Sequence, residues 1–140
     1  MKKFLCAANA LLAVLLALGP FCLAPVCAGS AANGGHMKCW HSAVFITACG
    51  ALLTLAAVVC LCRGGRRAWL VALFGAAAAA AVWGVPECCL SLGRLTCGWC
   101  AAADHACRAG TRPLTLTLAG ALLALDVAGL TALFLKGGAR

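Results

Sequence analysis

Four long apolar blocks dominate this sequence of 140 residues and restrict what it can fold into. They cover residues 4–27, 43–62, 68–85 and 114–135. Each block meets or approaches the roughly 20 residues that a helix needs to cross the hydrocarbon core of a bilayer. Only 10% of the residues are charged, whereas soluble domains carry about 25%. We therefore expect one integral membrane domain over residues 1–140, an all-α bundle of four transmembrane helices with a cysteine-rich extracytoplasmic cap.

The formal net charge of +8 is better explained by membrane topology than by nucleic-acid binding. Lys and Arg gather beside helix ends on the cytoplasmic side of a membrane. If both termini are cytoplasmic, seven of the 11 basic residues lie inside, namely Lys2, Lys3, Arg63, Arg66, Arg67, Lys136 and Arg140. The outer loops, 28–42 and 86–113, then hold Lys38, Arg94, Arg108 and Arg112. We expect a multi-pass protein of the cell membrane, in contact with the lipid bilayer and with no nucleic-acid partner.

The first apolar block has two interpretations. Lys2 and Lys3 before an apolar run resemble the start of a signal peptide, and residues 26–28 offer a tolerable cleavage site. The run nevertheless continues far enough to span a bilayer. We favour a retained helix, and cleavage of residues 1–28 stays open as the alternative.

The chain contains 12 cysteines, and the expected topology divides them unequally. Disulfides persist in oxidising compartments outside the cytoplasm. Candidates for disulfide bonding are therefore the eight cysteines of the outer side: Cys22, Cys27, Cys39, Cys88, Cys89, Cys97, Cys100 and Cys107. We expect the cysteines within the membrane or near the cytoplasm to stay reduced: Cys6, Cys49, Cys60 and Cys62.

Cys97 and Cys100 form a CxxC unit, a pattern found in thiol oxidoreductases and in metal sites. The βαβ context typical of thioredoxin-like enzymes is absent from the sequence. We favour structural disulfides for both thiols and keep a working redox pair as the alternative. A weaker pattern for a metal site combines loop histidines and cysteines: His36, Cys39, His41, His105 and Cys107. Loop histidines are more often solvated, so we expect neither a metal nor another cofactor.

Asp126 is the one acidic residue within an apolar block. A carboxylate at that depth costs several kcal/mol unless it faces protein or water. It would act as a proton or cation relay, or it would be neutral and hydrogen-bonded to Thr47, Thr54 or another polar neighbour. We favour the neutral structural group, because no basic residue lies within any apolar block.

Residues 34–41, Gly-Gly-His-Met-Lys-Cys-Trp-His, resemble a family of small four-span bacterial membrane proteins, domain of unknown function family 4418. The family shows a Met-Lys-Cys element before its second helix. A Cys-x6-Cys-Arg element and a Thr-x-Pro opening of the fourth helix follow, matched here by Cys100, Cys107, Arg108, Thr111 and Pro113. The resemblance implies that Cys39, Cys100 and Cys107 are the core cysteines, with Cys22 as the fourth. The chain departs from the pattern at residues 87–98, and the aromatic residue and His after Cys39 look transposed. No activity is assigned to the family.

These observations favour a non-enzymatic envelope component, such as an accessory subunit of a larger complex, with disulfide-stapled outer loops. Its partner would be another membrane protein or a second copy of the chain. The alternatives are a membrane thiol–disulfide oxidoreductase that uses Cys97 and Cys100, and more weakly a metal or haem carrier. Disulfide connectivity stays open, because eight cysteines allow 105 pairings.

The charge distribution predicts the orientation of the protein. Reporter fusions placed after Arg140 and within residues 63–67 should both report the cytoplasm, because most basic residues flank that side. An extracytoplasmic signal at Arg140 would contradict this topology and favour three mature spans after cleavage of the first block.

Overall fold

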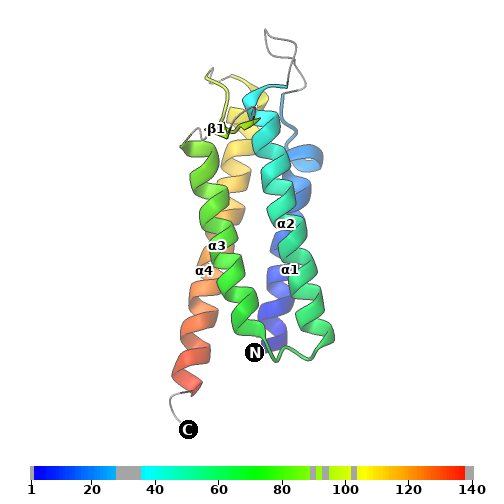
Figure 1. The fold of residues 1–140 in the computed structure, drawn as a ribbon, viewed down its shortest axis with the longest axis vertical. Coiled ribbons are helices and arrows are strands. Elements are labelled where there is room, and N and C mark those ends of the chain that lie inside the picture. The colour runs from blue at the N-terminus through cyan, green and yellow to red at the C-terminus, as the bar shows by residue number, and fades with distance from the viewer. Residues whose placement is uncertain (1, 28–35, 89–90, 93–94, 102–103, 138–140) are drawn as a thin grey trace.

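Four long helices run side by side and alternate in direction (Figure 1). The structure is a computed structural model that describes residues 2–27, 36–88, 91–92, 95–101 and 104–137. The helices are α1 (Lys2–Leu18), α2 (Lys38–Cys62), α3 (Ala68–Glu87) and α4 (Arg112–Gly137). A π-helical turn, η1 (Gly19–Leu23), extends the end of α1, and a second one, η2 (Cys107–Thr111), directly precedes α4. All four are long and apolar enough to cross a membrane. The predicted all-α, four-helix transmembrane class is confirmed.

The helices begin and end at different residues from the apolar blocks. The second helix begins at Lys38 rather than at residue 43, and the fourth helical segment begins at Cys107, ahead of Pro113. Pro113 therefore lies inside this segment, as the second residue of α4 directly after the π-helical turn η2. Between α3 and η2, β1 (Ser91–Leu92) pairs antiparallel with β2 (Leu95–Thr96), a short ladder that hydrophobic periodicity did not predict.

Helix direction places the functional features at two opposite ends. The first residues of α1, the turn between α2 and α3, and the end of α4 lie at one end of the bundle (Figure 1). The loop that follows η1, the start of α2, the β1–β2 ladder and η2 lie at the other end. Cys27, Cys39, Cys100 and Cys107 therefore lie at one end, and the basic turn at residues 63–67 lies at the opposite end.

Large apolar side chains cover much of the outer surface of the bundle. Phe4 is 71% exposed, Leu55 62% and Phe134 70%. A soluble protein rarely exposes contiguous apolar surface of this kind. The interior is instead built largely from small side chains, among them Ala13, Ala43, Ala57, Ala72, Ala79 and Ala119. This reversal of the soluble pattern is typical of helices that pack in lipid, where small residues let backbones approach.

The backbones of α1 and α2 approach each other closely at Gly50. A Cβ added at Gly50 would lie 2.7 Å from the backbone nitrogen of Ala17 and 2.8 Å from the carbonyl oxygen of Ala13. These neighbours are backbone atoms, so they cannot move aside without shifting α1.

Gly50→Ala should therefore lower the thermal stability of the protein in detergent. Gly84, in α3, is the matched control, because a Cβ there would meet no atom within 4 Å. Gly84→Ala should be neutral or stabilising, since Ala is favoured over Gly in a helix by about 1 kcal/mol. Equal melting temperatures for the two variants would show that α1 and α2 do not pack through Gly50.

Candidate functional site: a four-cysteine centre

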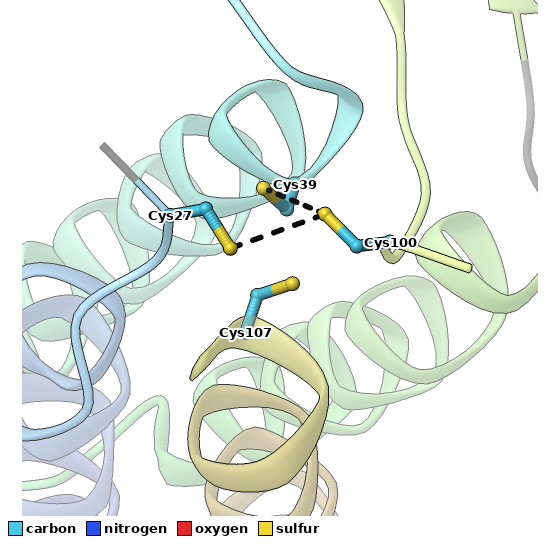
Figure 2. Close-up of side chains that lie close together, drawn as sticks. All are labelled: Cys27, Cys39, Cys100 and Cys107. Carbon is cyan, nitrogen blue, oxygen red and sulfur yellow. Dashed lines mark hydrogen bonds between the residues drawn. The ribbon is translucent and has the colours of Figure 1, made fainter. Parts of the chain in front are cut away.

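Four cysteine side chains converge between the helix ends at one end of the bundle (Figure 2). The sulfur atoms of Cys27, Cys39, Cys100 and Cys107 all lie within 4.8 Å of one another. The Cys100 sulfur is 3.6 Å from that of Cys39 and 4.0 Å from that of Cys27. Cys39 and Cys107 are fully buried, whereas Cys27 and Cys100 are partly exposed. We call this set the four-cysteine centre.

Each of the four cysteines comes from a different segment. Cys39 lies in the first turn of α2, and Cys107 is the first residue of η2. Cys27 follows η1, where the chain is held by a hydrogen bond from the Thr111 hydroxyl to the carbonyl oxygen of Ala24, at 2.7 Å. Cys100 follows the β1–β2 ladder. The centre therefore joins the ends of helical segments that are far apart in sequence.

Polar contacts fix the segment that carries Cys100. The Gly98 amide donates to the Ser42 hydroxyl oxygen at 2.7 Å, and that hydroxyl donates to the Gly98 carbonyl oxygen at 3.2 Å. Arg108 donates to the carbonyl oxygen of Ala101 at 2.8 Å. These contacts tie the loop to α2 and to η2, so the position of Cys100 depends on both.

An ion pair connects α3 and α4 at the same end of the bundle. The Arg112 guanidinium donates to the two carboxylate oxygens of Glu87 at 2.7 and 2.8 Å, a bidentate geometry. The Trp99 indole N–H donates to the same carboxylate at 3.0 Å. The end of α3, the start of α4 and the loop beside Cys100 are thereby connected next to the four-cysteine centre.

Burial and neighbouring thiols change the proton affinity of the loop cysteines. Burial raises the pKa of the Cys100 thiol, and its thiol neighbours Cys107 and Cys39 raise it further. At Cys27 burial acts in the same direction, but hydrogen bonds from the other three cysteines outweigh it and lower the pKa. Cys27 therefore loses its thiol proton more readily than Cys100 does.

The two residues of the CxxC unit have different neighbours. Cys100 faces the centre, whereas Cys97 lies beside the Ser42 hydroxyl. Burial raises the pKa of the Cys97 thiol as well as that of Cys100. A catalytic dithiol needs a thiolate near neutral pH. This arrangement does not favour the redox-pair alternative.

The histidines of the weak metal pattern are not members of the four-cysteine centre. His36 stacks on Trp40 with ring centroids 4.0 Å apart, and Arg108 donates its backbone N–H to the carbonyl of His105. Within the described ranges, the one group of three or more potential ligands is the four-cysteine centre, which includes Cys39 and Cys107 but neither these histidines nor His41.

The remaining outer cysteines do not join the centre. Cys22, which the family resemblance implied as the fourth core cysteine, is exposed in η1. The structure places Cys27 in that position, because the chain leaves η1 and turns back toward α2 before it reaches the centre (Figure 2). Cys88 is exposed at the end of α3, and Cys89 lies outside the described residues. No sulfur pair in the described part of the chain is at disulfide bonding distance.

A second polar contact lies inside the bundle and joins α1 to α4. The Asn9 side-chain amide donates to Asp126 Oδ1 at 2.7 Å and to the carbonyl oxygen of Leu5 at 3.1 Å. Asn9 and Asp126 are both fully buried. Gly75 in α3 makes room for the pair, since a Cβ there would collide with Asp126 Oδ2 and lie 2.8 Å from Asn9 Oδ1.

Asn9 is the partner of Asp126 that the sequence reasoning missed. The hydroxyls of Thr47 and Thr54 donate instead to backbone carbonyls, those of Ala17 and Gly50. The signal was present, because Asn9 is the one amide side chain in the first apolar block. Asn9 Oδ1 and Asp126 Oδ2 have no partner among the described residues. A proton on Asp126 would provide a donor between two acceptor oxygens, which favours the neutral form.

These features define a multi-pass membrane protein with a cluster of four cysteines at one end of a four-helix bundle. The family model described as "Domain of unknown function (DUF4418)" matches residues 9–135, and the chain belongs to this family. The matched range contains all four cysteines of the centre. The predicted family resemblance is confirmed. Neither the curated proteins nor the solved structures contain a match to this chain.

Asp126→Asn should leave stability almost unchanged. An Asn side chain can accept the Asn9 amide hydrogen and donate to Asn9 Oδ1, so both hydrogen bonds of a neutral pair are kept. Asp126→Leu removes the acceptor and leaves the buried Asn9 amide with only its hydrogen bond to the Leu5 carbonyl, which should cost about 1–3 kcal/mol of unfolding free energy. Unfolding in detergent measures both changes. If the Asn variant is expressed normally but loses the phenotype of the wild-type gene, Asp126 is a relay rather than a structural group.

Proposed function

We propose that this chain is a non-enzymatic membrane component, acting as an accessory subunit of a larger envelope complex, whose outer ends are cross-linked through the four-cysteine centre. The observation that carries this proposal is the convergence of four thiols from four segments within 4.8 Å. The loops that contribute Cys27 and Cys100 are short and have no core of their own. A cross-link at this point would hold the outer surface in one shape for a partner membrane protein.

The cross-link we propose consists of two disulfides, Cys39–Cys100 and Cys27–Cys107. The first is the sulfur pair at 3.6 Å, shorter than the 4.0 Å between Cys27 and Cys100. The second pairs the two thiols that remain, whose sulfur atoms lie within 4.8 Å of each other. This connectivity rests on the predicted extracytoplasmic position of the centre, since disulfides persist in oxidising compartments.

Each disulfide would link separate parts of the bundle. The Cys39–Cys100 bond would tie the start of α2 to the loop between α3 and α4. It would close a loop of 61 residues, which is worth about 4 kcal/mol from the entropy of the unfolded chain. The Cys27–Cys107 bond would tie the end of the α1–η1 segment to η2. Together they would fix all four helical segments at the outer end.

A metal site is the second candidate, and the mutual distances favour it specifically. In a tetrahedral zinc site with Zn–S bonds of about 2.3 Å, neighbouring sulfurs lie about 3.8 Å apart. The distances of 3.6 and 4.0 Å at Cys100 fit that arrangement. Four thiolates are a ligand set for zinc or another soft divalent metal. A bound metal would cross-link the same four segments.

Single Cys→Ser variants test whether the centre is a cross-link. Replacing Cys39 or Cys100 should lower the unfolding free energy in detergent by about 3–5 kcal/mol. Cys22→Ser is the control, since Cys22 is an exposed cysteine of the same end. A stable Cys100→Ser variant that lacks only an electron-transfer activity would contradict the proposal. So would a Cys97 and Cys100 pair that titrates as one couple well above about −250 mV.

Double variants and mass measurements identify the chemical form of the cross-link. If Cys39 and Cys100 are bonded to each other, the double Ser variant should be as stable as either single variant, whereas Cys39→Ser with Cys107→Ser should lose both bonds. With a metal, every single variant should lose the whole site. The intact mass should be lower by four hydrogens for two disulfides, and reductant should restore them. A bound metal would appear in native mass spectra and disappear with chelator.

A further inference from the structure

We propose that the groove between α2 and α3, at the end of the bundle opposite the four-cysteine centre, binds the phosphate headgroup of an anionic phospholipid. Arg63, Arg66 and Arg67 would hold the phosphate, and the apolar wall of the groove would contact the acyl chains. The proposal is independent of the function of the four-cysteine centre.

The groove combines a basic mouth with an apolar wall. It has a volume of about 1030 Å³ and is lined by the three arginines and by residues that include Val59, Leu70 and Phe74. These apolar side chains are exposed by 42%, 41% and 43%, respectively. They belong to the spanning helices α2 and α3, so the wall of the groove faces the hydrocarbon region while the arginines lie at its end. A phospholipid has the same division into a charged head and apolar chains.

The turn between α2 and α3 fixes the arginines in place. Gly65 N–H donates to the Cys60 carbonyl at 2.8 Å and Gly64 N–H to the Leu61 carbonyl at 3.0 Å, the two hydrogen bonds of a Schellman motif. Both glycines have positive φ, 71° and 75°. A Cβ at Gly65 would lie 3.2 Å from the Lys3 nitrogen, so the turn rests on the start of α1. The arginines before and after this turn are thus held at the groove mouth.

None of the three Asp and Glu side chains, all within the described ranges, is placed to neutralise these arginines. The chain has three acidic residues: Glu87 is paired with Arg112 at the opposite end, Asp104 lies in the loop before η2, and Asp126 is buried with Asn9. Lys2 adds further positive charge beside Arg66, where both line a smaller hollow of about 360 Å³. Unpaired basic pockets between transmembrane helices are typical binding sites for anionic headgroups.

A lipid fits the groove better than a soluble anion does. Inorganic phosphate would contact the guanidinium groups, which suit phosphate oxygens bidentately, but would leave the apolar wall uncovered. Trp69, in the first turn of α3 and 46% exposed, marks this level of the bundle as the interface where Trp side chains collect. Headgroup phosphates lie at the same depth in a bilayer.

Native mass spectrometry of the full-length protein, released from nanodiscs with phosphatidylglycerol or phosphatidylcholine, tests the proposal. The wild-type protein should retain phosphatidylglycerol in preference to phosphatidylcholine. Each of Arg63→Gln, Arg66→Gln and Arg67→Gln should weaken that retention about fivefold. Lys38→Gln is the matched control, because it removes one exposed basic charge at the opposite end and should leave retention unchanged. Phe74→Ala should weaken retention of the lipid without changing any charge.

Three results would overturn the proposal. The first is equal retention of the two lipids by the wild-type protein. The second is unchanged retention in the triple Arg→Gln variant, which remains informative because the arginines are exposed and their loss should not unfold the bundle. The third is a different ligand in the groove. Either inorganic phosphate displaces the lipid completely, or a second copy of the chain occupies the groove and dissociates in the Gln variants. Either form of the third result assigns the arginines to a different ligand.

Discussion

The bilayer removes the force that packs soluble proteins, and the structure follows from that constraint. Hydrocarbon offers no partner for a backbone N–H or C=O, so each spanning segment must satisfy its own groups as a helix. It also gives no hydrophobic gain for burying one apolar face against another. The helices are therefore held by close approach at small residues such as Gly50 and Ala13, and by contacts that lipid cannot replace. The Asn9–Asp126 pair is such a contact, since either side chain would be costly if it faced lipid.

The two ends of the bundle have different chemistry, which follows from where polar residues can lie. The chain carries nearly all of its charged residues at the two ends of the bundle, beyond the apolar parts of the helices. At one end four cysteines, the Glu87–Arg112 ion pair and the Ser42–Gly98 hydrogen bonds form a connected set. At the other end the arginines around Gly64 and Gly65 form no ion pair with another described residue. We infer that the first end is closed by internal cross-links and that the second end takes its counter-charge from the membrane.

The four-cysteine centre depends on the helices beneath it. Cys39 and Cys107 lie at the starts of helical segments, so their positions are set by how those segments pack against α1 and α3. Cys27 and Cys100 reach the same point from loops that are held by Thr111, Ser42 and Arg108. A cross-link among the four would stabilise the packing of the bundle, because it would join segments whose association gains no hydrophobic free energy in lipid. The centre and the interior pair would thus hold the bundle at two different depths.

The sequence alone determined the class of protein, because the evidence for a spanning helix is local. A run of about 20 apolar residues is read without knowing any neighbour, and the motif around Cys39, Cys100 and Cys107 was sufficient for the family. Tertiary structure alone decided which residues meet. Asn9 and Asp126 are separated by 117 residues, and Cys27 rather than Cys22 completes the centre because the chain turns back after η1. The groove beside Arg66 likewise requires the packing of α2 on α3. These contacts depend on the rotation and relative height of each helix, and uniformly apolar helices carry little periodicity from which either could be read.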